Sequence, residues 1–163
     1  RRFSVRAEVT TGEGQPPITI IDDYGHHPVE IIATLEGARE AWPHRRVLAV
    51  FQPHRYTRVR DLFDDFARAF HMADHVVVCP VYRAGERPID GIDQHTIGAR
   101  IAGFGHRSVH VVDDLASATD HLAEIAQPGD VIMTLGAGDV NQICDALGAH
   151  LRSAKLAAES LDV

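Results

Sequence analysis

The 163-residue sequence has only two cysteines, Cys79 and Cys144, and neither belongs to a CxxC pair. This scarcity excludes a zinc ribbon and a secreted disulfide scaffold, and it favours a reducing cytoplasm. Cys79 follows three valines and is interpreted as a small buried hydrophobe. No apolar run approaches the roughly 20 residues that a membrane-spanning helix needs, and the N-terminal RRFSVRAEV lacks a signal-peptide core. We therefore expect a cytoplasmic protein with no membrane partner.

The sequence also lacks an excess of basic residues. Its formal net charge is −7 with histidines neutral, which argues against a nucleic-acid partner, because non-specific binding needs a broad basic surface. It lacks a GxxxxGK[ST] motif as well, so the chain has no recognisable nucleotide triphosphate cradle of its own. We expect one domain spanning residues 1–163, with a tail at 152–163 that either extends the last helix or frays.

The order of apolar patterns predicts an α/β fold. Residues 3–9 and 18–24 flank a segment rich in Gly and Pro and indicate an antiparallel hairpin. Beyond them, near-continuous apolar runs alternate with helical periodicity at 47–51, 75–80, 108–112 and 130–135. We predict a Rossmann-like three-layer domain with a mostly parallel sheet of about six strands, an antiparallel N-terminal hairpin strand and helices on both faces.

Helix boundaries follow from local signals. Pro28 can open a helix that Pro43 ends, and Thr57 can cap a second helix whose buried stripe runs to Phe70. Further helices are expected at about 94–103, 114–126 and 139–151. Several of the eleven histidines lack an evident partner, and we expect them to be surface residues, among them His44, His71, His106 and His121.

Polar loops follow the expected parallel strands at their carboxyl ends. In open α/β sheets this edge binds ligands, so the loops should converge on one site. They are DDYGHHP at 22–28, QPHRYTR at 52–58, VYRAGE at 81–86 and GAGDV at 136–140.

In QPHRYTR, Arg55 and Arg58 lie three residues apart at the start of a helix, with His54 beside them. Guanidinium groups near a helix N-terminus bind carboxylates and phosphates well, so this loop is a candidate anion site. The alternative is that the arginines are solvated and pair with Asp61, Asp64 and Asp65 on the same helix.

DDYGHHP allows a metal site, an acid-base histidine or an acid that contacts a nucleotide. A metal site is geometrically awkward, because neighbours in a short loop rarely aim at one point, although His54 could add a ligand. The plainest reading is a polar turn that Asp23 closes and in which Gly25 has a positive φ. GAGDV is weak evidence for a phosphate loop, but an anion or an amino-acid backbone could rest there.

Taken together and in this order, the loops DDYGHHP, QPHRYTR, VYRAGE and GAGDV resemble the C-terminal domain of the Mur ligases. The closest resemblance is to those members that add L-alanine to UDP-N-acetylmuramate, and it covers nearly the whole chain. It implies that this chain is part of a longer ligase and that its partners are the enzyme's own N-terminal domain, which holds the UDP-sugar, and its central domain, which carries the P-loop. ATP and Mg²⁺ are the implied cofactors, bound mainly by that central domain.

The resemblance also implies roles for residues. ATP phosphorylates the lactyl carboxylate, and the amino group of L-alanine attacks the resulting acyl phosphate. The implied catalytic residues are His54, Arg55 and Arg58. The implied substrate-binding residues are Tyr24, His26, Gly136 and Asp139. Those implied to lie near ATP are Asp23, His27 and either Arg1 or Arg2. Arg83 departs from the small residue expected in VYRAGE, so we assign that loop no role.

Two alternatives stay open at this point. One is a related ligase that recycles murein peptides by attaching a preformed peptide to the same sugar. The other is a stand-alone module that binds a nucleotide or an amino acid. Under the ligase hypothesis, the chain should fold alone but catalyse nothing, because its ligand contacts come from one side only.

Overall fold

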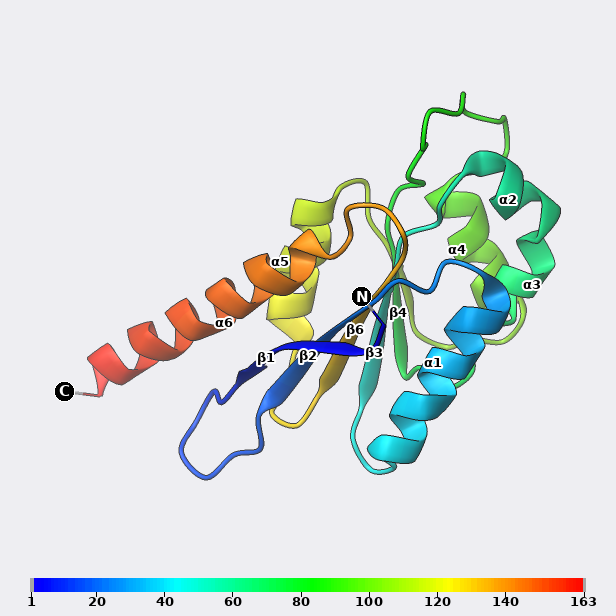
Figure 1. Ribbon diagram of the computed structural model, residues 1–163. Coiled ribbons are helices and arrows are strands. Elements are labelled where there is room, and N and C mark those ends of the chain that lie inside the picture. Colours follow the sequence, from blue (N-terminus) through cyan, green and yellow to red (C-terminus); the bar gives the residue numbers. More distant parts are fainter. Residues whose placement is uncertain (1, 163) are drawn as a thin grey trace.

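The computed structural model describes residues 2–162 and contains a six-stranded mixed sheet (Figure 1). The strands are β1 (Ser4–Val9), β2 (Ile18–Asp23), β3 (Val47–Phe51), β4 (His75–Val78), β5 (Val109–Val111) and β6 (Val131–Leu135). Their order in the sheet is β1-β2-β6-β3-β4-β5, with β1 antiparallel to β2 and the other neighbours parallel. The predicted fold class is confirmed.

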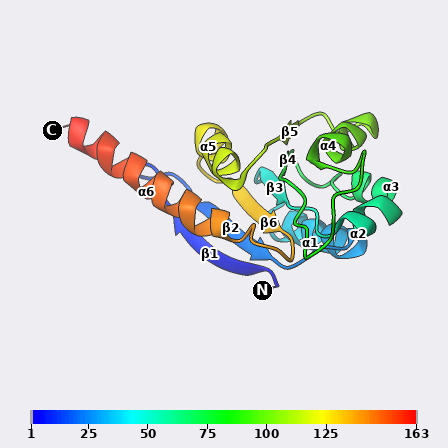
Figure 2. The same ribbon diagram turned by 90° about the horizontal axis from the view of Figure 1, so that it is seen from above.

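Helices cover both faces of the sheet, as Figure 2 shows from above. One face carries α1 (Pro28–Ala41), α2 (Tyr56–Asp61), α3 (Phe63–Ala67) and α4 (Gln94–Gly103). The opposite face carries α5 (Leu115–Ile125) and α6 (Gln142–Leu161). Every residue of the central strands β2, β3 and β6 is buried, because helices shield both of their faces.

Each face of the sheet has its own apolar core. Against α1–α4, Phe51 of β3 packs on Phe66 and Phe70, with ring centroids 5.5 and 5.0 Å apart. Against α5 and α6, buried residues of β2, β3 and β6 meet Leu122 and Leu147. The alternation of side chains along each strand divides the apolar residues between these two cores.

Two helix predictions need correction. The second helix begins at Tyr56 with Arg55 as its N-cap, so Thr57 is not the cap, and the helix is divided at Leu62 into α2 and α3. The last helix begins at Gln142 rather than near 139 and continues to Leu161, so of the two alternatives for the tail the structure shows an extension of α6. Arg1 lies outside the described residues. Within residues 2–162, no helix is long and apolar enough to cross a membrane.

Candidate functional site

The candidate site lies at the carboxyl edge of the sheet, where the strand order changes direction. From β3 the chain proceeds outward to β4 and β5, and it then returns to β6 on the other side of β3. Such a switch point opens a crevice between two strand ends, and ligands of α/β proteins bind there. The loops after β2, β3, β4 and β6 meet at this edge, as predicted: His26 lies beside His54, His54 beside Tyr82, and Gln52 bonds Asp139.

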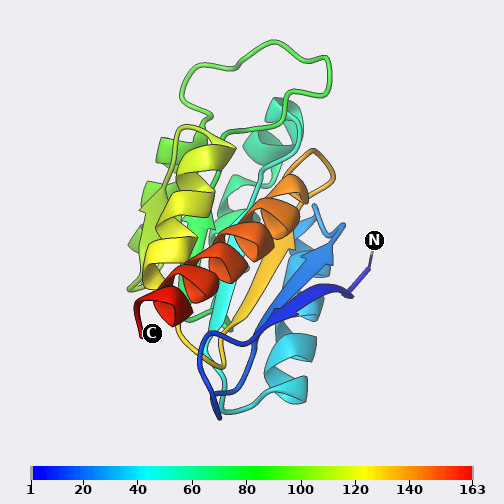
Figure 3. The same ribbon diagram turned by 90° about the vertical axis from the view of Figure 1, so that its left-hand side faces the viewer.

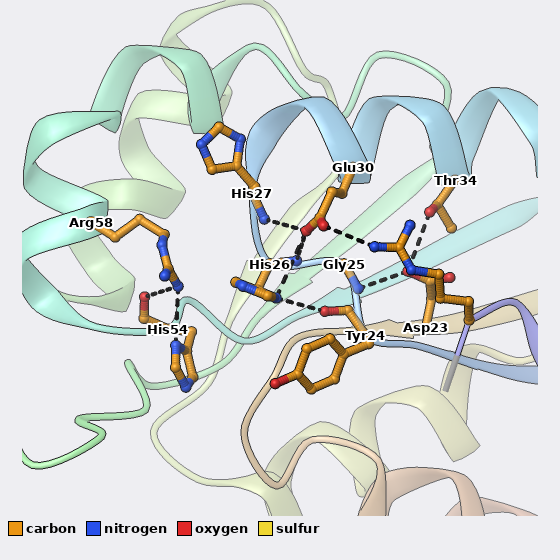
Figure 4. A network of polar contacts seen from close by, with 10 residues as sticks. Asp23, Tyr24, Gly25, His26, His27, Glu30, Thr34, His54 and Arg58 are labelled. Carbon is orange, nitrogen blue, oxygen red and sulfur yellow. Dashed lines mark hydrogen bonds and ion pairs between the residues drawn. The ribbon is translucent and has the colours of Figure 1, made fainter.

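Asp23 fixes the loop that follows β2. One carboxylate oxygen, Oδ2, accepts a hydrogen bond from the backbone N–H of Phe3 at 2.7 Å. The other, Oδ1, accepts from the N–H of Gly25 at 2.7 Å and from the Thr34 hydroxyl at 3.3 Å (Figure 4). The polar-turn reading is therefore correct for Asp23. It is wrong about a positive φ at Gly25, whose lack of a side chain matters because a Cβ would lie 2.8 Å from Oδ1 of Asp23.

Glu30 holds the next part of the same loop. Its Oε2 accepts the N–H groups of His26 at 3.1 Å and His27 at 3.2 Å, and its Oε1 pairs with Arg2 at 3.2 Å. Partial burial acts to raise the pKa of this carboxyl, but the two backbone donors and the charges of His26 and Arg2 lower it. Sequence reasoning missed Glu30, although a glutamate three residues after a helix N-cap is the signal of a capping box.

Five side chains from the segments that follow β2, β3 and β4 come together above these supports. The rings of Tyr24 and His26 meet edge to face at 5.0 Å, and His26 lies 5.6 Å from His54. Arg58 reaches back from α2, so that its Nη1 donates to Nδ1 of His54 at 3.1 Å (Figure 4). Tyr82 stacks on the far side of His54 at 5.5 Å, with the two rings 8° from parallel.

The surroundings of His54 determine its charge and which of its ring nitrogens carries the proton. Burial is the main cause that lowers the pKa of His54 to about 4, helped by the charges of Arg58, His26 and Arg55. The imidazole is therefore neutral at pH 7. An arginine can only donate, so Nδ1 of His54 accepts from Arg58 and Nε2 carries the proton. His54 thus presents an N–H donor, rather than a positive charge, to the site.

The surface-pairing alternative holds for Arg60 but not for Arg55 and Arg58. Arg60 pairs with Asp61 at 2.9 Å, but Asp64 pairs with Arg100 of α4 at 2.8 Å. Arg55 is exposed, and its guanidinium has no hydrogen-bond partner within residues 2–162. Arg55 and Arg58 therefore keep their charges available at the carboxyl edge.

The loop after β6 forms the opposite wall. Gln52 donates to Oδ1 of Asp139 at 2.7 Å and accepts from the N–H of Val140 at 3.2 Å, which fixes Asp139 at the crevice. Gly138 permits close packing, because a Cβ there would lie 2.5–2.6 Å from Gln52 and the Tyr82 ring. A pocket of about 510 Å³ opens beside these groups, and its lining also includes Arg83, Asp114 and Leu115.

The described part of the chain offers no evident metal centre. Within residues 2–162, no group of three or more His, Cys, Asp or Glu side chains is arranged to hold a metal ion. In DDYGHHP, Asp22 is buried and accepts from Thr134 at 2.8 Å, whereas the exposed His27 points away from Tyr24 (Figure 4). Neighbours in this loop thus aim in different directions.

Comparison with known proteins defines the family. The model of the Mur ligase, glutamate ligase domain family matches residues 1–138. The chain belongs to the Mur ligase family.

Relatives with curated names support a narrower similarity. The chain is 54% identical over 126 residues to UDP-N-acetylmuramate-L-alanine ligase of Desulfosudis oleivorans, covering 77% of this chain and 28% of that protein. It is 48% identical over 152 residues to the enzyme of the same name from Hyphomonas neptunium, covering 93% and 32%. The chain thus spans about a third of the length of these relatives.

Solved structures show the same fold. UDP-N-acetylmuramate-alanine ligase from Thermotoga maritima is 28% identical, with a TM-score of 0.70, and the match covers 94% of this chain and 30% of that one. The murein peptide ligase from Psychrobacter arcticus has a TM-score of 0.72 at 24% identity, covering 93% and 30%. The second similarity concerns the fold alone.

In this Mur ligase domain, most of the predicted site residues fall into three groups, while Arg55 and His27 are exposed beside them. The residues that the structure brings together are Tyr24, His26, His54 and Arg58. Gly136 and Asp139 form the wall of the crevice beside Gln52. Asp23 and Arg2 lie on the other side of the loop after β2, tied to Phe3 and Glu30 respectively.

Proposed function

We propose that this chain is the C-terminal domain of a cytoplasmic, ATP-dependent ligase that joins L-alanine to UDP-N-acetylmuramate in peptidoglycan synthesis. The observation that carries the proposal is the agreement between relatives of that name at 44–54% identity and a carboxyl-edge site that presents two arginines and a neutral histidine. The chain would form one domain, and the N-terminal and central domains would supply the sugar site and the P-loop.

The proposed chemistry needs stabilisation of negative charge. Transfer of a phosphoryl group to the lactyl carboxylate gives an acyl phosphate. The alanine ammonium group loses a proton to solvent, and the resulting amine attacks to give a tetrahedral oxyanion. This intermediate expels phosphate, and the nitrogen releases a second proton as the amide forms. Arg55 and Arg58 offset these charges, and Nε2–H of His54 adds a donor that carries no charge of its own. Donors that are fixed before the reaction stabilise a developing charge without reorganisation, and each is typically worth about 3 kcal/mol of barrier.

Asp23, Arg2 and His27, on the other side of the loop after β2, can supply some of the contacts that a nucleotide needs. Oδ2 of Asp23 accepts one hydrogen bond within residues 2–162, from Phe3, so a second lone pair can accept a ribose hydroxyl. Arg2 is largely exposed and can approach the same ligand, as can His27. Bound ATP would supply the phosphoryl group, with Mg²⁺ held mainly by the central domain, while these residues orient the nucleotide.

The amino-acid substrate would lie between the two walls of the crevice. Tyr24 and His26 border one side, and the loop of Gly136 and Asp139 borders the other. In this proposal, Asp139 attracts the ammonium group of free alanine and Arg55 binds its carboxylate. This arrangement would hold the nitrogen near the acyl phosphate, where orientation alone contributes greatly to the rate.

The test is phosphate release by the full-length enzyme with ATP, UDP-N-acetylmuramate and free L-alanine. Arg58→Ala should lower kcat by about 100-fold or more, because it removes both a charge and the donor that orients His54. Arg60→Ala is the matched control, since Arg60 pairs with Asp61 on the surface and should leave kcat unchanged. Turnover with a preformed peptide but not with alanine would favour a recycling ligase. Ligand binding without any turnover would favour a binding module.

A further inference from the structure

The loop between β4 and α4 reaches the candidate site through Glu86. Figures 1 and 3 show this green segment rising beyond the carboxyl edge of the sheet, next to α2. The partly buried carboxylate of Glu86 accepts from the backbone N–H of Thr57 at 3.1 Å with Oε2, and from the Thr57 hydroxyl with Oε1. It also interacts with the backbone N–H of Tyr56. Glu86 thus binds the first turn of α2 from about thirty residues further along the chain.

The start of α2 needs such an acceptor. The first N–H groups of a helix have no partner within the helix, and the N-cap side chain usually accepts one of them. The N-cap of α2 is Arg55, whose guanidinium can only donate, and it makes no side-chain cap bond. The carboxylate of Glu86 therefore occupies the place that a Ser or Asp side chain at position 55 would fill.

Arg55 is also in an unfavourable backbone conformation. Its φ of 68° and ψ of 125° lie outside the regions that residues with a side chain ordinarily adopt. Such a conformation persists only where the surroundings impose it. Here the N–H of Arg55 donates to the carbonyl of Tyr82 at 2.9 Å, and the N–H of Tyr82 donates to the carbonyl of Pro53 at 2.8 Å. The same loop that carries Glu86 therefore clamps the backbone on both sides of His54.

A tight turn sets the position of Glu86. Its N–H donates to the carbonyl of Arg83 at 3.1 Å, and the two residues between them, Ala84 and Gly85, have φ values of 49° and 84°. Two successive positive φ values reverse the chain within four residues. The turn directs the Glu86 side chain back toward α2.

We propose that Glu86 is a positioning residue that caps α2 in place of the N-cap side chain, and so allows an arginine to stand at position 55 facing the ligand. This inference rests on the proposed function of Arg55 and Arg58. The carboxylate is charged at pH 7, because hydrogen bonds from the Thr57 side chain and backbone lower the pKa of Glu86.

The first experiment compares Glu86→Ala, Glu86→Gln and the control Glu13→Ala in the full-length ligase. Glu13 is an exposed glutamate in the β1–β2 turn, at the opposite edge of the sheet. Glu86→Ala should lower kcat by about tenfold to 100-fold with little change in the KM for ATP, since small displacements of catalytic groups have effects of that size. Glu86→Gln should recover most of the rate, because its amide oxygen can still accept from the N–H of Thr57 while its NH2 donates to the hydroxyl. A kcat within twofold of wild type for Glu86→Ala, or equal losses for both variants, would overturn the proposal.

A second measurement does not depend on the reaction. In NMR hydrogen exchange on this chain, Glu86→Ala should speed exchange of the Tyr56 and Thr57 amides by about tenfold or more and leave Val50 in β3 unchanged. Unchanged exchange at Thr57 would refute the cap even in an active enzyme. Faster exchange in a protein that does not use alanine would keep the cap and refute the proposed function instead.

Discussion

Acidification should destabilise this domain through a cluster of histidines far from the candidate site. Nε2 of His75, at the start of β4, lies 2.9 Å from Nε2 of His121 on α5, so one of the two nitrogens donates and the other accepts. The ring of His110 on β5 stacks on His121 at 3.6 Å, and Nδ1 of His75 bonds the hydroxyl of Ser108 at 2.6 Å. A proton added to this cluster enters a partly buried site already crowded with imidazoles.

The size of the effect follows from His75. Burial is the main cause that lowers the pKa of His75 to about 4, followed by the charges of His121, His110, Arg46 and His106. The pKa of His121 is also lowered, by burial and by His110, and the charge of Glu124 partly offsets that shift. The unfolded chain, with a pKa near 6.5, binds more protons between these two values, so the free energy of unfolding falls as the pH drops through that window. At pH 4.5 the full difference is about 2.5 kcal/mol, which solvent screening around the half-buried ring reduces to about 1–2 kcal/mol.

Urea unfolding at pH 7 and pH 4.5 measures this contribution. His75→Gln keeps hydrogen-bonding capacity toward Ser108 and His121 but cannot be protonated, so it should lose about 1–2 kcal/mol less than wild type on acidification. His71→Gln, at an exposed histidine, is the control and should behave as wild type. His54 titrates in the same window and contributes equally to all three proteins. The reasoning is refuted if His75→Gln and wild type lose the same free energy.

Two further predictions concern the cores. Gly98→Ala would place a Cβ against Cγ2 of Val111, closer than two carbon atoms can approach, and should lower the free energy of unfolding by about 1–3 kcal/mol. The cost should be much smaller in a Val111→Ala background, and equal costs in both backgrounds would contradict this contact. Burial raises the pKa of the Cys79 thiol to about 12 and that of Cys144 to about 11, so iodoacetamide at pH 8 should label neither in the native domain and both in urea. Rapid labelling of either thiol in the native domain would show that it is not buried.

Local patterns were sufficient for the sheet and for the place of the site. The run Val47–Phe51 could be recognised from the sequence as a strand covered on both faces because all five of its residues are apolar. The structure buries all five. Once the strands are parallel, topology brings the loops that contain Tyr24, His54 and Asp139 to the same edge, whatever the details of the side chains.

The supports of the site depend on contacts that no local pattern contains. The sequence predicts Thr57 as the cap of the second helix because threonine is a good N-cap, whereas the acceptor at the start of α2 is Glu86. His121 was expected to be an exposed residue without a partner, and it proves to be part of the His75 cluster because α5 packs over β4 and β5. The pair Thr57–Glu86 and the pair His75–His121 each join segments about thirty or more residues apart, so spacing along the chain could not reveal them.

The charges of the site are divided in a way that suits an anionic intermediate. Three of the carboxylates that border it accept backbone N–H groups: Asp23 from Phe3 and Gly25, Glu30 from His26 and His27, and Glu86 from Thr57. A carboxylate that accepts hydrogen bonds from backbone N–H groups of a loop holds that loop in place. Arg55 and Arg58 have no carboxylate hydrogen-bonded to them within residues 2–162, so no such ion pair neutralises their charges. These three carboxylates are therefore engaged with the loops that they hold, and the arrangement is consistent with the anionic intermediates of the proposed ligase reaction.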